Sequence, residues 1–145
     1  MRVVQVGQGA FGWRWFQEIL VKSEHVEVVG IVEHNQELLQ RAAEVAGVAQ
    51  ENLFSDLNEA LEKGKPDFVL NTTPPHIHSE IIRTCLRYGI PVLCEKPVSD
   101  DWEDALYLYQ DVQRSGVRVM IAENYRYKPI IRQTKRLLVE GGMLS

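Results

Sequence analysis

The chain has 145 residues, of which 45% are hydrophobic and 25% charged, a composition typical of one globular domain. Its net charge is −4, so we expect no nucleic-acid partner, because such partners favour a basic surface. No apolar run approaches the ~20 residues of a membrane helix, and the first residues lack a signal-peptide pattern. Cys85 and Cys94 do not have the spacing of metal ligands. We therefore expect a cytoplasmic protein with no metal and no membrane partner.

Short apolar runs alternate with segments of helical periodicity along the whole chain. The runs at residues 3–6, 26–32, 68–70, 92–94 and 117–122 are rich in Val and Ile, as in strands that are covered on both faces. The helical segments are residues 11–22, 36–46, 57–63, 79–88, 102–114 and 130–140. This alternation predicts the α/β class, with a doubly wound, mainly parallel sheet and helices on both of its faces.

Several helix boundaries carry capping residues. Asn35 is predicted to cap the helix at 36–46, which Gly47 ends. Asp56, with Glu59 three residues later, resembles a capping box, and Gly64 is expected to stop that helix. Acidic residues also precede the helix at 102–114, where they favour the positive end of its dipole.

The segment between the first strand and the first helix reads G-x-G-x-x-G, the pattern of a dinucleotide-binding loop. In that pattern Gly7 allows the tight turn, Gly9 leaves room for a pyrophosphate, and Gly12 lets the helix pack closely on the strand. Ala10 and Phe11 lie where the helix is expected to start, and the amides at its N-terminus favour phosphate. A tight turn that binds no ligand is the alternative.

Glu33 closes the second predicted strand, at about the distance from the glycine loop where dinucleotide-binding folds place an acidic residue. Such a carboxylate accepts hydrogen bonds from the adenosine ribose and repels a 2′-phosphate. No Lys or Arg follows it before Arg41, so we predict NAD rather than NADP as the cofactor. His34, next in the chain, is assigned either to the adenine or to the plain surface.

Three polar segments follow apolar runs in the second half of the chain. They are N-T-T-P-P-H-I-H at residues 71–78, C-E-K-P at 94–97 and A-E-N-Y-R-Y-K-P at 122–129. Ligands of open α/β sheets bind beyond the carboxyl ends of the strands. We therefore expect these segments to lie at the same edge of the sheet as the glycine loop.

These motifs, in this order, resemble the Gfo/Idh/MocA family of oxidoreductases, which includes glucose–fructose oxidoreductase and inositol dehydrogenase. The resemblance runs from the glycine loop through T-P-P-x-x-H and E-K-P to N-Y-R-Y-x-P, and so spans the chain. It implies that residues 1–145 form the dinucleotide-binding Rossmann domain. It also implies that the family's C-terminal α/β substrate domain, which supplies the main acid/base histidine, is absent from this chain.

The resemblance assigns roles to individual residues. Lys96 matches the catalytic lysine of E-K-P, which lies beside the nicotinamide, contacts the reacting hydroxyl of the substrate and stabilises a developing alkoxide. Glu95 is expected to hold Lys96 in place, and Pro97 is a candidate for a cis peptide bond. The remaining predicted cofactor contacts are Thr73, Pro74, His78 and Asn124.

We therefore expect the NAD-binding domain of a dehydrogenase that transfers a hydride between a nicotinamide and a sugar, cyclitol or related polyol. By itself the fragment should be inactive, because the missing domain supplies the second wall of the substrate site. We also expect a homo-oligomer, because the surface facing that domain is apolar. The alternatives are a non-catalytic dinucleotide sensor or regulatory module, and a Rossmann-like domain for another nucleotide such as S-adenosylmethionine.

Overall fold

The structure, a computed structural model, describes residues 1–141 and contains one sheet of six parallel strands. Its strand order is β3-β2-β1-β4-β5-β6, so the chain starts at the centre, winds outward to one edge and then continues from the centre to the other. This confirms the doubly wound α/β fold that the sequence predicts. The strands are β1 (Arg2–Val6), β2 (Glu27–Val32), β3 (Leu53–Phe54), β4 (Phe68–Asn71), β5 (Val92–Cys94) and β6 (Val119–Ile121).

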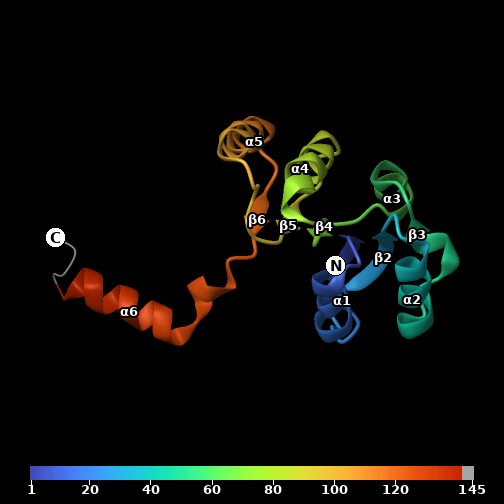
Figure 1. Ribbon diagram of the computed structural model, residues 1–145, viewed down its shortest axis with the longest axis horizontal. Helices are drawn as coiled ribbons and strands as arrows, with labels where there is room; N and C mark the ends of the chain where they lie inside the picture. Colours follow the sequence, from blue (N-terminus) through green and yellow to red (C-terminus); the bar gives the residue numbers. More distant parts are fainter. Residues whose placement is uncertain (142–145) are drawn as a thin grey trace.

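Helices cover both faces of the sheet (Figure 1). In this view α1 and α2 lie below β1, β2 and β3, whereas α3, α4 and α5 lie above the sheet. These helices are α1 (Ala10–Trp15), α2 (Gln36–Ala46), α3 (Leu57–Gly64), α4 (His78–Arg87) and α5 (Trp102–Ser115). The connections include a π-helix, η1 (Phe16–Leu20), and two 3-10 turns, η2 (Gln50–Asn52) and η3 (Pro75–Ile77).

The core consists of two apolar clusters, one on each face of the sheet. Val3 packs with Phe16 in the first cluster, while its neighbour Val4 packs with Leu61 and Ile82 in the second. Successive side chains of a strand point to opposite faces, so a strand that is covered on both sides is apolar at most positions. This requirement explains the apolar runs in the sequence, and Gln5 of β1 is a buried polar exception.

The predicted caps of α2 are confirmed. The Asn35 side chain accepts a hydrogen bond from the N–H of Glu37 at 2.9 Å, and Gly47 adopts the left-handed conformation with φ 63°. Asp101 caps α5 in the same manner by accepting the N–H of Asp104 at 2.7 Å. These local signals define both helix starts because each side chain satisfies an amide that the helix leaves unpaired.

The predicted end of α3 is wrong by one residue. Asp56 caps its start through the N–H of Glu59 at 2.9 Å, but the Glu59 carboxylate pairs with Lys63 at 2.6 Å. Gly64 lies inside the helix, and Lys65 takes the left-handed conformation with φ 44°. Gly64 is buried where an added Cβ would lie 3.3 Å from the carbonyl oxygen of Val29, so close packing on the sheet favours glycine there.

The helix predicted at residues 11–22 is divided. It runs as α1 to Trp15 and continues as the π-helix η1, in which the N–H of Val21 bonds to the carbonyl of Phe16 at 3.0 Å. Such i to i+5 bonding is rare and occurs mostly as single turns within helices.

The last helix, α6 (Pro129–Glu140), follows the 3-10 turn η4 (Asn124–Tyr127) and extends away from the sheet (Figure 1). Pro129 occupies its first turn, as predicted, and none of its residues is buried. No helix within residues 1–141 is both long enough and apolar enough to cross a membrane.

Candidate functional site

The predicted motifs lie together beyond the carboxyl ends of the strands. The glycine loop follows β1, and the three polar segments follow β4, β5 and β6, which are consecutive neighbours in the sheet. The N–H of Thr72 bonds to the carbonyl of Val6 at 2.9 Å. In the same way, the N–H of Glu95 bonds to the carbonyl of Asn71 at 2.9 Å. Because all the strands are parallel, segments far apart in the sequence meet at their carboxyl ends.

The three glycines of the loop differ in their backbone conformation and in the space around them. Gly7 has φ 91°, which side chains rarely adopt. At Gly12 an added Cβ would lie 2.2 Å from the carbonyl oxygen of Gly7, so the helix packs against the loop with no room for a side chain. Gly9 has φ −59°, and an added Cβ there would meet nothing within 4 Å. The loop therefore needs Gly7 and Gly12 for its own folding, whereas Gly9 leaves open space outside it.

Glu33 joins the glycine loop to the loop after β2. Its Oε2 accepts the backbone N–H of Gln8 at 2.7 Å, and its Oε1 accepts the N–H of Asn35 at 3.0 Å. Each carboxylate oxygen has more than one lone pair, so Glu33 keeps capacity to accept hydrogen bonds from a ligand hydroxyl.

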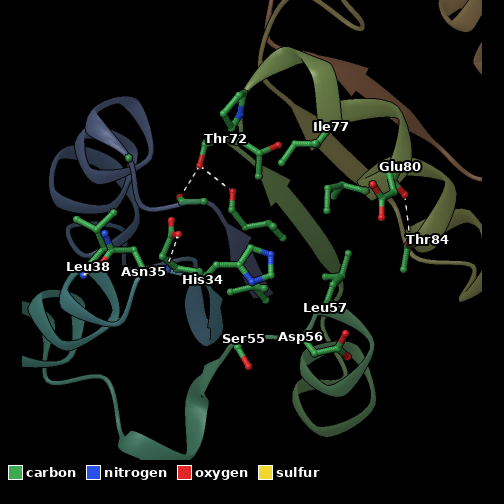
Figure 2. Close-up of a pocket in the computed structure, with 18 of the residues that line it drawn as sticks. His34, Asn35, Leu38, Ser55, Asp56, Leu57, Thr72, Ile77, Glu80 and Thr84 are labelled. Atoms are coloured by element: carbon green, nitrogen blue, oxygen red, sulfur yellow. Dashed lines mark hydrogen bonds between the residues drawn. The ribbon is translucent and has the colours of Figure 1, made fainter.

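A cavity of about 730 Å³ lies against the glycine loop and the ends of β2 and β4 (Figure 2). In this view His34 extends into the cavity, across from Leu57 at the start of α3. The predicted cofactor contacts that line it are Gly7, Gly9, Ala10, Phe11, Glu33, His34, Thr73 and Pro74. The predicted contacts that do not line it are Gly12, His78, Glu95, Lys96 and Asn124.

The far end of the cavity is formed by residues that the sequence analysis does not identify. Ser55 precedes α3, Asn58 lies in its first turn, and Glu80, Ile81 and Thr84 come from α4. No local motif marks these residues, because only the packing of α3 beside α4 places them along one cavity.

The cavity is acidic. Its lining includes the carboxylates of Glu33, Asp56 and Glu80, and none of the described residues that line it is Lys or Arg. The cavity therefore favours hydroxyl and amine donors.

Two buried polar side chains support the glycine loop from the sheet. The Thr72 hydroxyl lies 2.8 Å from the carbonyl oxygen of Gly7 and 3.0 Å from that of Val6 (Figure 2). The Gln5 side chain donates to the carbonyl of Gly12 at 2.8 Å. Gln5 has no role assigned from the sequence, and Thr72 is included in the polar segment at 71–78 without a role of its own. A polar residue inside the apolar strand β1 is the signal that identifies Gln5, because buried polar groups need partners.

The E-K-P turn follows β5 and has a cis peptide bond between Lys96 and Pro97, as anticipated. Glu95 is only 9% exposed, and its Oε1 accepts the indole N–H of Trp15 at 2.6 Å. Its Oε2 accepts the backbone N–H of Lys96 at 3.2 Å. The glutamate therefore contacts the backbone of the lysine rather than its ammonium group.

His78 links the E-K-P turn to the loop after β4. The ring is fully buried, with Nδ1 at 2.7 Å from the carbonyl oxygen of Pro97 and Nε2 at 2.7 Å from that of Thr73. Both nitrogens thus face the protein's own backbone, so in this structure His78 holds the two loops together. Its predicted contact with the cofactor stays a prediction.

Lys96 and Asn124 lie in the turns beyond β5 and β6, and both are exposed. These neighbouring strands place them at one end of the sheet, outside the cavity. Within residues 1–141 no cluster of three or more His, Cys, Asp or Glu side chains is arranged to hold a metal ion.

The geometry fits a dinucleotide. The open space at Gly9 gives a phosphate access to the backbone of the glycine loop, and the first turn of α1 begins there. Glu33 lies in the same cavity, at the position where this fold recognises a ribose.

Comparison with known proteins gives an independent result. Residues 1–123 match the model of the oxidoreductase family with an NAD-binding Rossmann fold, GFO_IDH_MocA. A 4-carboxy-2-hydroxymuconate-6-semialdehyde dehydrogenase from Sphingobium sp. is 32% identical over 97% of this chain and 44% of its own. An inositol 2-dehydrogenase from Arthrobacter sp. is 32% identical over 80% of this chain and 34% of its own.

Solved structures share the fold. Scyllo-inositol dehydrogenase from Lactobacillus casei, with bound NAD(H) and scyllo-inositol, has a TM-score of 0.86 at 22% identity, covering 98% of this chain and 42% of its own. The WlbA dehydrogenase from Bordetella pertussis, in complex with NADH and UDP-GlcNAcA, has a TM-score of 0.86 at 26% identity, covering 97% of this chain and 40% of its own. The chain thus spans less than half the length of these relatives. By its glycine loop, its strand order and its match over residues 1–123, it belongs to the Gfo/Idh/MocA family of NAD-binding oxidoreductases.

Proposed function

We propose that this chain binds NAD and forms the cofactor side of a dehydrogenase site for a sugar, cyclitol or related polyol. The observation that carries the proposal is the open space at Gly9, in the same cavity as the Glu33 carboxylate. A branched side chain at position 9 would fill the space that a pyrophosphate needs, while the fold itself does not require glycine there.

The charges of the cavity support NAD over NADP. A 2′-phosphate on the ribose would approach Glu33, and Asp56 and Glu80 add further negative charge to the lining. Enzymes that bind NADP place a cation near this phosphate. Among residues 1–141, none of those lining the cavity is Lys or Arg.

Lys96 is proposed to act on the substrate. When bound, NAD supplies the acceptor for the hydride that leaves the substrate carbinol. The ammonium of Lys96 stabilises the negative charge that develops on the substrate oxygen as its proton leaves. We place the main acceptor of that proton in the part of the relatives that this chain does not cover.

The substrate class follows from the relatives. The inositol dehydrogenases compared above act on a cyclitol by name. The E-K-P motif that the family resemblance associates with the reacting hydroxyl is present here as Glu95, Lys96 and Pro97. A hydroxyl flanked by further hydroxyls is therefore the proposed reacting group.

Calorimetric titration of the chain with each cofactor tests the first part of the proposal. NAD should bind at least about tenfold more tightly than NADP. With NADP, a hydrogen bond between a ribose hydroxyl and Glu33 is replaced by repulsion between the 2′-phosphate and that carboxylate. Equal affinities, or tighter binding of NADP, would contradict the assignment of Glu33.

Turnover tests the second part. NADH formation with a panel of cyclitols and sugars should appear in the longest chain that the gene encodes. Lys96→Ala should lower kcat by about a hundredfold or more, as loss of a charge-stabilising group does, while the Kd for NAD changes little. Lys63→Ala, on the exposed face of α3, is the matched control and should retain full activity.

A further inference from the structure

A tryptophan outside the cavity contacts the turn that carries Lys96. Trp15 is the last residue of α1, and its indole N–H donates to Oε1 of Glu95 at 2.6 Å across 80 positions of sequence. The other carboxylate oxygen accepts the backbone N–H of Lys96 at 3.2 Å. One buried carboxylate therefore joins the helix that follows the glycine loop to the backbone of the proposed catalytic lysine.

Because Glu95 is buried, its carboxylate depends on the hydrogen bond from Trp15. At 9% exposure the carboxylate has little access to water, so its charge is stabilised by hydrogen bonds from the protein. An indole N–H only donates, so it suits an ionised carboxylate, and the short distance is typical of a charge-assisted bond. Without Trp15, Oε1 loses its donor and the side chain is free to rotate toward solvent.

Rotation of Glu95 would release the backbone of Lys96. The main chain of Lys96 sets the point from which its long, flexible side chain extends, so movement of the turn would displace the region that the ammonium group can reach. On the other side of the turn, His78 contacts the carbonyl of Pro97 at 2.7 Å. Glu95 and His78 thus hold the turn from both sides, and Trp15 fixes one of them.

We propose that Trp15 is a positioning residue that orients Lys96 through Glu95. This inference rests on the proposed function in one respect, namely the role of Lys96 at the reacting hydroxyl. Catalytic groups must be held to within about 0.5 Å of their productive positions, which a turn fixed by buried hydrogen bonds achieves. Trp15 does not line the cavity, and its indole N–H donates to Glu95, so we place its action at the E-K-P turn.

If Trp15 only filled apolar space, replacing it with another aromatic residue would leave the Lys96 turn unchanged. Trp15 also packs against the cluster that contains Phe16 and Leu70. Trp15→Phe keeps an aromatic ring for that packing and removes only the indole donor. Trp13→Phe is the matched control, because Trp13 packs on Phe16 with ring centroids 5.7 Å apart in the same cluster and does not contact Glu95 in the structure.

Nitrogen-15 NMR of the chain provides the test. The wild-type indole proton of Trp15 should resonate downfield of those of Trp13 and Trp102, and Glu95→Gln should move it upfield. In Trp15→Phe, hydrogen exchange of the Lys96 backbone amide should accelerate about tenfold, the scale of one lost charge-assisted hydrogen bond. Trp13→Phe should leave the exchange of that amide unchanged.

The outcomes separate this inference from the proposed function. Unchanged Lys96 exchange in Trp15→Phe, or equal acceleration in Trp13→Phe, would overturn it. If Trp15→Phe does not fold, the indole proton of Trp15 in Glu95→Gln decides instead, and an unchanged resonance would overturn the inference. If the wild-type chain binds no NAD while the Lys96 amide responds as expected, the proposed function fails and the link between Trp15 and the turn stands.

Discussion

The backbone N–H of Gln8 donates to the carboxylate of Glu33 at 2.7 Å, so the acidic residue at the end of β2 holds the glycine loop in place. The same side chain accepts the N–H of Asn35 at 3.0 Å. Glu33 therefore fixes two loops that form the cavity, in addition to the contact with ribose that we propose for it.

Removing the Glu33 carboxylate should therefore weaken NAD binding and also reduce the preference for NAD over NADP. For Glu33→Ala we expect NAD affinity to fall by about tenfold, on the scale of one hydrogen bond to a charged group. NADP affinity should change less, because the repulsion of its phosphate disappears at the same time. Calorimetry with both cofactors measures the ratio, and Glu44→Ala, an exposed carboxylate on α2 that does not line the cavity, is the control. An unchanged ratio would show that Glu33 does not face the ribose.

Gly9 and Gly12 should respond in opposite ways to substitution. Gly9→Val should keep the thermal stability of the chain, since φ is −59° and a Cβ meets nothing within 4 Å, yet it should abolish cofactor binding. Gly12→Ala should lower the free energy of unfolding by about 3 kcal/mol or more, because its Cβ would lie 2.2 Å from the carbonyl oxygen of Gly7. Circular dichroism beside calorimetry checks both, and a Gly9→Val variant that binds NAD normally would contradict the phosphate assignment.

Asp104 should make part of the stability depend on pH. Hydrogen bonds from Ser79, Arg83 and Ser99 lower the pKa of this carboxyl, with Ser79 the largest cause, while desolvation opposes them. A depressed folded-state pKa stabilises the fold above the unfolded pKa of about 4, and this contribution is lost as the pH falls through the folded value. Asp104→Asn should reduce the free energy of unfolding at pH 7 by about 1 kcal/mol.

Urea unfolding at several pH values tests this expectation. The difference between wild type and Asp104→Asn should begin to shrink as the pH falls below about 4, where the unfolded carboxyl is protonated, and it should vanish below the lower folded-state pKa, where the carboxyl is protonated in both states. Asp100→Asn, at an exposed position before α5, should show little difference at any pH. A difference for Asp104→Asn that is independent of pH would exclude its ionised carboxylate as the cause.

The two cysteines should be unreactive in the folded chain. Burial raises the pKa of both Cys85 and Cys94 to about 12, and both side chains are fully buried. Thiolate is the reactive form, so near pH 8 iodoacetamide should label neither cysteine until the chain unfolds. Mass spectrometry across a guanidinium series should show labelling that follows the loss of circular dichroism. Labelling of Cys94 at native conditions would show that β5 opens on its own.

Short-range patterns in the sequence determined most of the strands and helices, and they identified the loop after β1 as a dinucleotide-binding loop. Continuous apolar runs and period-3.6 patterns depend on residues a few positions apart, so they predict buried parallel strands and amphipathic helices without knowledge of the fold. For the same reason Asn35 and Asp56 identify helix starts, since a capping side chain reaches only two or three residues ahead. The glycine loop is local as well, because its spacing reflects one turn between a strand and a helix.

Only the tertiary structure decided which of these elements meet. The strand β3 has two residues, too few for a pattern, and it exists because Ile31 and Val32 of β2 pair with it. Gly64 lies inside α3, packed against the sheet, and Lys65 rather than the glycine takes the left-handed conformation that ends the helix. The contact from Trp15 to Glu95 spans 80 positions. Such contacts arise because parallel winding brings every strand's carboxyl end to one edge, and sequence spacing carries no record of which side chains then lie within hydrogen-bonding distance.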